Sequence, residues 1–448
     1  MLLKKTLKYF FIFLIALSLT MVLTRHYFRP QLSLLVNMII NQVAADGISA
    51  DTPEIKLNEK PSPLISLNKY EVKIPPADSK SAKIVNSLFP GSPRITADRL
   101  KDFPPDFIEN LWKSNSSLNK TLSDMAGFSE ITGESEIKIP ETVAMKDSTD
   151  SVYFDIADKF RIIGLMCRAA LEKKDYVFMI DAELASIAAA RYLPICSSDG
   201  IPNLFLQSFA FDVLAVMNEN AFNLYINNDD IIKNDLSRAM LKKALDSRMR
   251  YLSSIIKLPL LVKCDDIYRK AFMKKYKETY LWLTSFVDLI SGGPPYSDLD
   301  EFINGINLEP EISYSQLYSR FKDFNGKYYL RASSGLISHP FRKVATKYNE
   351  KIPVYFGVQQ TNLRIVTLYG LARIYNFENN RWPDTNDEGN FIKGAACCGV
   401  DPITSRPFKT TFENNKFVIS ADVDNWPEDF KIEGREMIKK WRPGISAP

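Results

Sequence analysis

Apolar residues recur every three or four positions through the middle of the chain, from about residue 152 to 291. In the first of these stretches the apolar residues on one helical face are Ile156, Phe160, Ile163, Cys167 and Leu171. Glycine and proline are scarce until "SGGPPYSD" at 291–298, which cannot continue a helix. The pattern predicts five long helices, packed as an antiparallel bundle or as a stack of helix hairpins.

Weaker patterns on either side predict shorter elements. Clusters of proline, serine and asparagine delimit short helices expected at 81–90, 104–113 and 117–126. After the break at 291–298 we expect a short helix at 313–323, a loop over 326–343 and a long helix over 358–378.

Two short runs of alternating polar and apolar residues lie near the C-terminus, in "FKTTFENNKFVIS" at 408–420. They are joined by Glu413–Lys416 and predict a β-hairpin. Before it, Pro402 fixes φ after Asp401, whose side chain is able to cap its own turn. We expect the hairpin to fold back across the 358–378 helix and to bury its apolar face. The predicted fold class is therefore mainly α, with a small C-terminal α+β hairpin region.

The N-terminal residues indicate a membrane anchor. An uncharged run from Tyr9 to Thr24 follows three lysines and precedes Arg25. The run lacks a small-x-small cleavage site, so we interpret residues 1–29 as a signal-anchor, with a cleaved signal peptide as the alternative. The lysines favour a cytoplasmic N-terminus. We therefore expect a single-pass protein of the cell inner membrane, with the bulk of the chain on the periplasmic side.

Composition changes along the chain suggest four parts. They are a signal-anchor at 1–29, a juxtamembrane helix and extended linker at 30–80, a helical domain at 81–291, and a C-terminal helix with a β-hairpin region at 299–448.

Charge and residue counts limit the chemistry. The net charge of +4 comes from interspersed acids and bases, so no nucleic-acid partner is expected. Two histidines, His26 and His339, provide little for acid–base or metal chemistry. Five cysteines include no C-x-x-C pair. In an exported chain Cys397 and Cys398 are expected to pair with each other, to stay unpaired, or to join Cys196 or Cys264.

Several residues are of types that could act as catalytic or binding groups. The serine–histidine neighbours Ser338 and His339 lack a nucleophile elbow. Asp181 with Glu183, and Asp265 with Asp266, stand too close in sequence to face each other on a helix. Gln207 and Asp212 are interpreted as helix-to-helix hydrogen-bonding residues. The aromatic stripe of Tyr268, Phe272, Tyr276 and Tyr280 is interpreted as core. No catalytic, cofactor-binding or metal-binding residue is assigned, and no cofactor is expected.

The tail also carries a recognisable order of residues. Along 363–424 the marker residues are Tyr375, Trp382, Pro383, Asp401, Pro402, Pro407 and Ser420. This order resembles the C-terminal half of the major pseudopilins of type II secretion, which implies a helix followed by turns and a small antiparallel sheet. The pseudopilin calcium loop is not reproduced, because its glycines are missing around Asp424. Together with the anchor and the helical middle, the chain resembles membrane-anchored envelope proteins of the planctomycete–lentisphaera group.

These expectations favour a non-catalytic envelope scaffold or protein-interaction protein. An envelope hydrolase with a carboxylate-lined cleft in the helical domain is the alternative, as is a module that binds a small ligand. A cleft with two accessible carboxylates would favour the hydrolase, whereas a well-filled interior would favour the scaffold.

Overall fold

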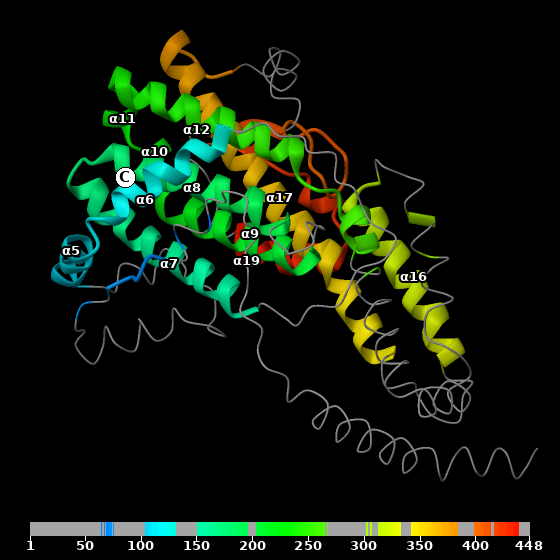
Figure 1. The fold of residues 1–448 in the computed structure, drawn as a ribbon. Helices are drawn as coiled ribbons and strands as arrows, with labels where there is room; N and C mark the ends of the chain where they lie inside the picture. The colour runs from blue at the N-terminus through cyan, green and yellow to red at the C-terminus, as the bar shows by residue number, and fades with distance from the viewer. Residues whose placement is uncertain are drawn as a thin grey trace, which may run out of the picture. The chain divides into compact units, whose positions relative to one another are not determined.

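The computed structural model describes residues 104–130, 150–195, 203–264, 312–332, 342–383, 398–413 and 416–438, with a few positions at 64–75, 267 and 302–306. These residues are mainly helical, and they include one small two-stranded sheet (Figure 1). The expected anchor, the 81–90 helix and the aromatic stripe beginning at Tyr268 lie outside the described residues.

The chain divides into two compact units. One comprises Met1–Glu54, Arg269–Glu309 and Leu317–Ile352, and the other Ile55–Tyr268, Pro310–Gln316 and Pro353–Pro448. In the first unit, the ring of Phe302 stacks on Phe324 at 4.4 Å and meets Phe321 edge-on. The second unit contains every other contact considered below.

Helices of the second unit follow the predicted periodicity closely. They are α5 (Pro105–Ser114), α6 (Leu118–Gly127), α7 (Asp150–Glu172), α8 (Tyr176–Tyr192), α9 (Leu204–Met217), α10 (Asn223–Ile226), α11 (Asp229–Lys233) and α12 (Asp235–Ser254). The short helices expected at 104–113 and 117–126 are confirmed as α5 and α6. A π-helical turn, η3 (Asn218–Phe222), joins α9 to α10, and no sequence pattern predicted it.

Helix α8 lies at the centre of this unit. Asp175 caps its first turn by accepting a 3.1 Å hydrogen bond from the Phe178 amide. Alanines at 182, 185 and 188–190 are completely buried. Because their side chains are small, α6, α7, α9 and α12 all pack against this one helix (Figure 1). A helix buried on most sides shows little amphipathicity, which is why apolar residues occur all around α8.

Part of the expected 30–80 linker is built into the same unit. Leu64 and Leu67 are fully buried, and the Lys159 ammonium of α7 donates to the Leu67 carbonyl at 3.0 Å. The Asn115 side chain accepts from the Lys73 amide and donates to the Lys73 carbonyl, at 2.9 and 2.8 Å. The side-chain amide thus substitutes for a strand partner and fixes this segment beside α5.

Two helices are longer than their sequence patterns indicated. Helix α16 covers Tyr314–Ala332, so the loop expected from residue 326 is wrong in its first part. One glycine inside a helix costs only about 1 kcal/mol, and Gly326 did not end α16. Helix α17 covers Arg342–Asn379 and continues through Pro353. The loss of one backbone hydrogen bond at this proline did not end the helix.

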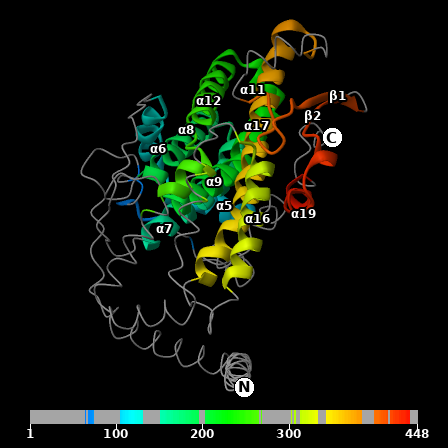
Figure 2. The same cartoon turned by 90° about the vertical axis from the view of Figure 1, so that its right-hand side faces the viewer.

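The predicted hairpin is confirmed as β1 (Lys409–Glu413) and β2 (Lys416–Ser420), which pair antiparallel with Phe412 opposite Phe417. It is followed by a 3-10 turn, η4 (Val423–Asn425), and by α19 (Glu428–Ile438). We call residues 398–438 the tail. Figure 2 shows the tail on the side of α17 that faces away from α8 and α9. Trp382 stacks on Phe417 at 4.9 Å, so the end of α17 and the hairpin share one aromatic contact.

The tail belongs to the same compact unit as the central helices. Gly357 shows the reason. A methyl group at its Cα would lie only 3.0 Å from Ile403 and from Phe430, so the tail approaches the α17 backbone closely. On another part of α17, a methyl group at Gly370 would lie 2.8 Å from Leu245 of α12. Helix α17 is thus packed between the central helices and the tail.

Candidate functional site

A buried polar cluster joins α8, η3 and α12. The Arg248 Nε donates a 2.5 Å hydrogen bond to Oε1 of Glu183, and Nη2 donates to Oδ1 of Asn218. The exposed fractions are 3% for Arg248, 1% for Glu183 and 0% for Asn218. We call these three residues the Arg248 centre. Burying two charges is costly, and only a close pair with further hydrogen bonds compensates for that cost.

The π-helical turn shapes the Arg248 centre from one side. In η3 the Asn223 amide bonds to the Asn218 carbonyl, five residues earlier. Both ends of the turn then contact the same guanidinium, since Phe222 places its ring 3.7 Å from the Arg248 Cζ. The charge is therefore held by a carboxylate, by an amide and by an aromatic face.

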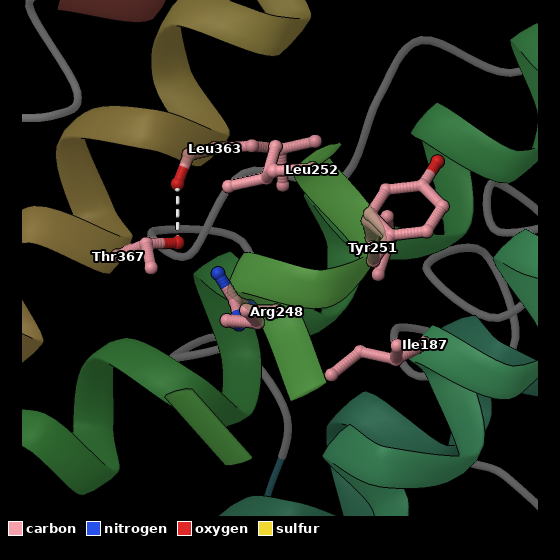
Figure 3. Close-up of a pocket in the computed structure, with 7 residues that line it drawn as sticks. Ile187, Arg248, Tyr251, Leu252, Leu363 and Thr367 are labelled. Atoms are coloured by element: carbon pink, nitrogen blue, oxygen red, sulfur yellow. Dashed lines mark hydrogen bonds between the residues drawn. The ribbon is translucent and has the colours of Figure 1, made fainter. Parts of the chain in front are cut away.

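A small cavity adjoins this centre. It is lined by Ile187, Leu214, Arg248, Tyr251, Leu252, Leu363 and Thr367, and we call it the Arg248 pocket (Figure 3). Its volume of about 10 Å³ corresponds to one water molecule. Thr367 donates a 2.7 Å hydrogen bond to the Leu363 carbonyl on the α17 side of the pocket. The pocket is therefore much too small for a sugar, a peptide or a nucleotide.

Four buried polar atoms near the Arg248 centre are able to form further hydrogen bonds. Oε2 of Glu183, Nδ2 of Asn218, Oγ of Ser247 and Nη1 of Arg248 are buried, and none has a hydrogen-bond partner among the described residues. Such atoms are uncommon in protein interiors and call for a physical explanation.

Cys167 lies in the same part of the interior, on α7, with its thiol free. Burial raises the pKa of this thiol well above its ordinary value, and the negative charge of Glu183 adds to the effect. The thiolate is the nucleophilic form of cysteine. Cys167 therefore stays protonated and behaves as a small apolar side chain, as its position on the predicted apolar face suggested.

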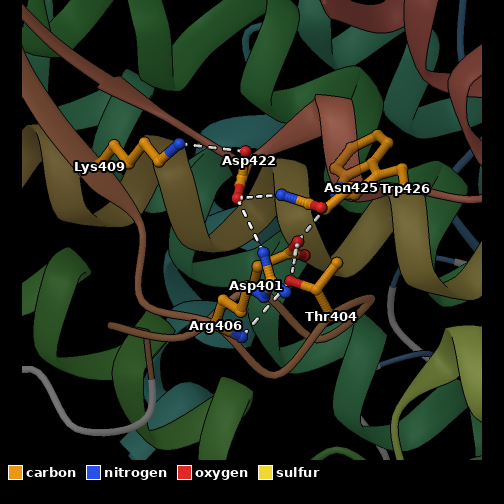
Figure 4. A network of polar contacts seen from close by, with 7 residues as sticks. All are labelled: Asp401, Thr404, Arg406, Lys409, Asp422, Asn425 and Trp426. Carbon is orange, nitrogen blue, oxygen red and sulfur yellow. Dashed lines mark hydrogen bonds and ion pairs between the residues drawn. The ribbon is translucent and has the colours of Figure 1, made fainter.

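The second polar cluster lies where the tail meets α17. The carboxylate of Asp401 is 1% exposed and receives four hydrogen bonds. At 2.8–3.0 Å the donors are Thr361 Oγ1, the Ile403 amide, Thr404 Oγ1 and Trp426 Nε1. We call this the Asp401 hub. The predicted turn cap is thus confirmed by the Ile403 contact. The hub also connects α17 to the turn through Thr361, and Figure 4 shows Asp401 together with Thr404 and Trp426.

Asp422 forms a separate, more exposed contact group beside the Asp401 hub. It accepts from Lys409 at 3.1 Å, from Arg406 at 3.2 Å and from Asn425 at 2.6 Å (Figure 4). The hydrogen bonds from Lys409 and then Asn425 lower the pKa of the Asp422 carboxyl. Its oxygens are directed to cationic side chains at the position where the pseudopilin calcium loop was compared.

The structure places the predicted polar candidates in structural roles. Asp212 accepts a 2.6 Å hydrogen bond from Tyr355, and Gln207 donates to Tyr251 at 3.4 Å, so the helix-to-helix interpretation of both is confirmed. Asp181 does not join Glu183. Burial raises the pKa of its carboxyl, against the lowering effect of a hydrogen bond with Ser123.

The remaining candidates cannot be placed, because Ser338, His339, Asp265 and Asp266 lie outside the described residues, as do Cys196 and Cys397. Sequence reasoning missed the roles of Arg248 and Asn218. The available signal was that Arg248 is a charged residue on an otherwise apolar face of its helix. The spacing of residues in the sequence did not identify its partner, Glu183.

Comparisons with known proteins add no relative: the chain matches no protein-family model, no curated protein and no solved structure. The resemblance of the tail to pseudopilins therefore stays a prediction from its residues. Within the part of the chain that the structure describes, no helix is long and apolar enough to cross a membrane. The expected anchor at 1–29 lies outside the described residues.

Proposed function

We propose that this protein is a membrane-anchored, non-catalytic scaffold of the cell envelope. In this proposal residues 1–29 hold the chain in the inner membrane. The helices at 104–264 form an antiparallel bundle on the periplasmic side, and the pseudopilin-like tail presents a surface to another envelope protein.

The state of Glu183 carries this proposal. Of the two candidate carboxylates that the structure describes, Asp181 and Glu183, Glu183 is the more deeply buried, at 1% exposure. Its Oε1 is engaged by Arg248, and the adjacent Arg248 pocket holds one water at most. A glycoside hydrolase needs two carboxylates that both reach the substrate. Glu183 contributes to packing in this arrangement and not to a substrate cleft.

The attachment of the tail supports the same function. A scaffold must hold its interaction surface in a fixed position, and the Asp401 hub connects α17, the turn and η4 through one buried carboxylate. This construction gives a defined surface at the end of a helical body.

The first experiment tests the location of the protein. Full-length protein is expected in the membrane fraction of the native host, whereas deletion of residues 1–29 is expected to release it. Fusions of alkaline phosphatase, which is active only after export, to residue 448 should be active. A mature N-terminus between residues 20 and 50 would contradict the anchor, and inactive fusions would contradict the periplasmic location.

A second experiment tests the scaffold role. Cross-linking in intact cells followed by purification should recover a defined envelope protein with the wild-type chain. Less of that protein should be recovered with Asp401→Ala, which loosens the tail, and an unchanged amount with Asp422→Asn as the matched surface control. Turnover of cell-wall glycans or peptides by the purified protein would contradict a non-catalytic role.

A further inference from the structure

The Arg248 pocket has features of a specific hydration site inside the protein. Its walls are mostly apolar, and polar groups are contributed by Arg248 on α12 and Thr367 on α17. Figure 3 shows the Arg248 side chain and the Thr367–Leu363 hydrogen bond bordering the same space. Arg248 is 3% exposed, and its Nη1 has no hydrogen-bond partner among the described residues.

We propose that the Arg248 pocket binds one ordered water molecule, which connects α12 to α17. The water accepts a hydrogen bond from Nη1 of Arg248. It donates to Oγ1 of Thr367, whose own proton is already given to the Leu363 carbonyl at 2.7 Å. The Leu363 carbonyl is not a further partner, because within α17 it already accepts from the Thr367 backbone amide as well as from Oγ1. These two partners lie within the two to four hydrogen bonds that buried waters make in globular proteins.

Size and charge favour water over other ligands. The cavity of about 10 Å³ accommodates a single water and excludes larger solutes. An anion would need an uncompensated positive charge, but the Arg248 guanidinium already forms an ion pair with Glu183. Water requires neither volume nor charge beyond what the pocket provides.

The bound water adds a polar contact between α17 and the central helices of the second unit. Helix α17 contacts the tail on one side, through Thr361 and Asp401, and borders the Arg248 pocket on the other. The bridging water extends the polar contacts of the Arg248 centre to α17. The helix that supports the tail is then hydrogen-bonded to the buried charge pair as well as packed against α12.

The test compares two matched hydroxyl deletions. Thr367→Val removes a buried hydroxyl that borders the pocket, and Ser186→Ala removes one that does not. Both hydroxyls donate to a carbonyl of their own helix at 2.7 Å. A crystal structure that resolves waters, or a nuclear Overhauser effect between a long-lived water and the Thr367 methyl group, detects the site in the wild-type protein.

We expect a bound water in the wild type and in Ser186→Ala, and its loss in Thr367→Val. The melting temperature of Thr367→Val should lie about 2–4 °C below that of Ser186→Ala, since only the former loses a water-mediated bond to a buried charge. A dry pocket in the wild type would overturn the proposal. A water retained unchanged in Thr367→Val, or equal melting temperatures for the two variants, would also overturn it.

Discussion

The indole nitrogen of Trp426 donates a 2.8 Å hydrogen bond to Oδ2 of Asp401, and both side chains are almost completely buried. The two residues belong to different segments of the tail, because the whole hairpin lies between them. Asp401 on its own caps a local turn. With Trp426 and Thr361 it also fixes the tail to α17, which makes this carboxylate the most connected polar group described in the tail.

Replacement of Asp401 by alanine should destabilise the protein strongly. The change leaves the donors Thr361, Thr404 and Trp426 without their acceptor in a buried place, and we expect a loss of about 2–4 kcal/mol in the free energy of unfolding. Urea unfolding followed by tryptophan fluorescence measures it. Asp422→Asn is the control, with a much smaller expected change because the partners Arg406 and Lys409 are exposed to solvent. Equal losses for the two variants would show that the Asp401 hub has no special importance.

The ion pair of the Arg248 centre should behave as a unit. Arg248→Met leaves the Glu183 charge buried and unpaired, so we expect a loss of about 3–5 kcal/mol in unfolding free energy. The double variant Arg248→Met/Glu183→Leu removes both charges and should recover most of that loss. Chemical denaturation of the single and double variants gives the coupling energy. Additive effects would contradict the pairing of Arg248 with Glu183.

Gly370 should not tolerate a side chain. A Cβ atom there would lie 2.8 Å from Leu245, so Gly370→Ala must displace α17 from α12 or shift the leucine, at a cost of about 1–3 kcal/mol. Gly127, near the end of α6, has no atom within 4 Å of the corresponding position. Gly127→Ala should therefore stabilise the protein by up to about 1 kcal/mol, through helix propensity. Thermal unfolding would refute this contrast if both variants shifted in the same direction.

Asp422 and Asp181 should affect pH dependence in opposite directions. The pKa of Asp422 is lowered in the folded state, so its contribution to stability is present above the unfolded pKa and is lost as pH falls through the folded pKa. The pKa of Asp181 is raised in the folded state. Compared with an uncharged residue, Asp181 therefore contributes most to stability below its unfolded-state pKa, and this stability is lost as pH rises through its folded-state pKa.

The aspartate-to-asparagine variants test this difference. At neutral pH, Asp181→Asn should be more stable than the wild type and Asp422→Asn less stable. Both differences should shrink as pH falls below about 4, where carboxyl groups become protonated. Denaturant midpoints measured between pH 3 and 7 provide the comparison. A difference that stays constant with pH for either variant would rule out its assigned shift.

The sequence by itself determined the local elements of this protein. Periodic apolar positions identified α5, α6 and the long central helices, and alternation with a short polar turn identified β1 and β2. Asp401 before Pro402 identified a capped turn, which the Ile403 hydrogen bond confirms. These features depend on residues a few positions apart, so their causes are visible in a linear sequence. Predicted helix ends were less accurate, because α16 and α17 continue through Gly326 and Pro353, residue types that usually mark helix ends.

Only the tertiary structure decided which distant residues meet. Arg248 and Glu183 are 65 positions apart, and Thr361 and Asp401 are 40 apart. No spacing rule selects Glu183 as the partner of Arg248 among the many acids of the chain. The choice follows from the close packing around the alanine-rich helix α8, which brings α12 near enough for one short hydrogen bond. A buried charge is stable only with such a partner, so the three-dimensional packing, and not the residue pattern, assigns Glu183 to the core.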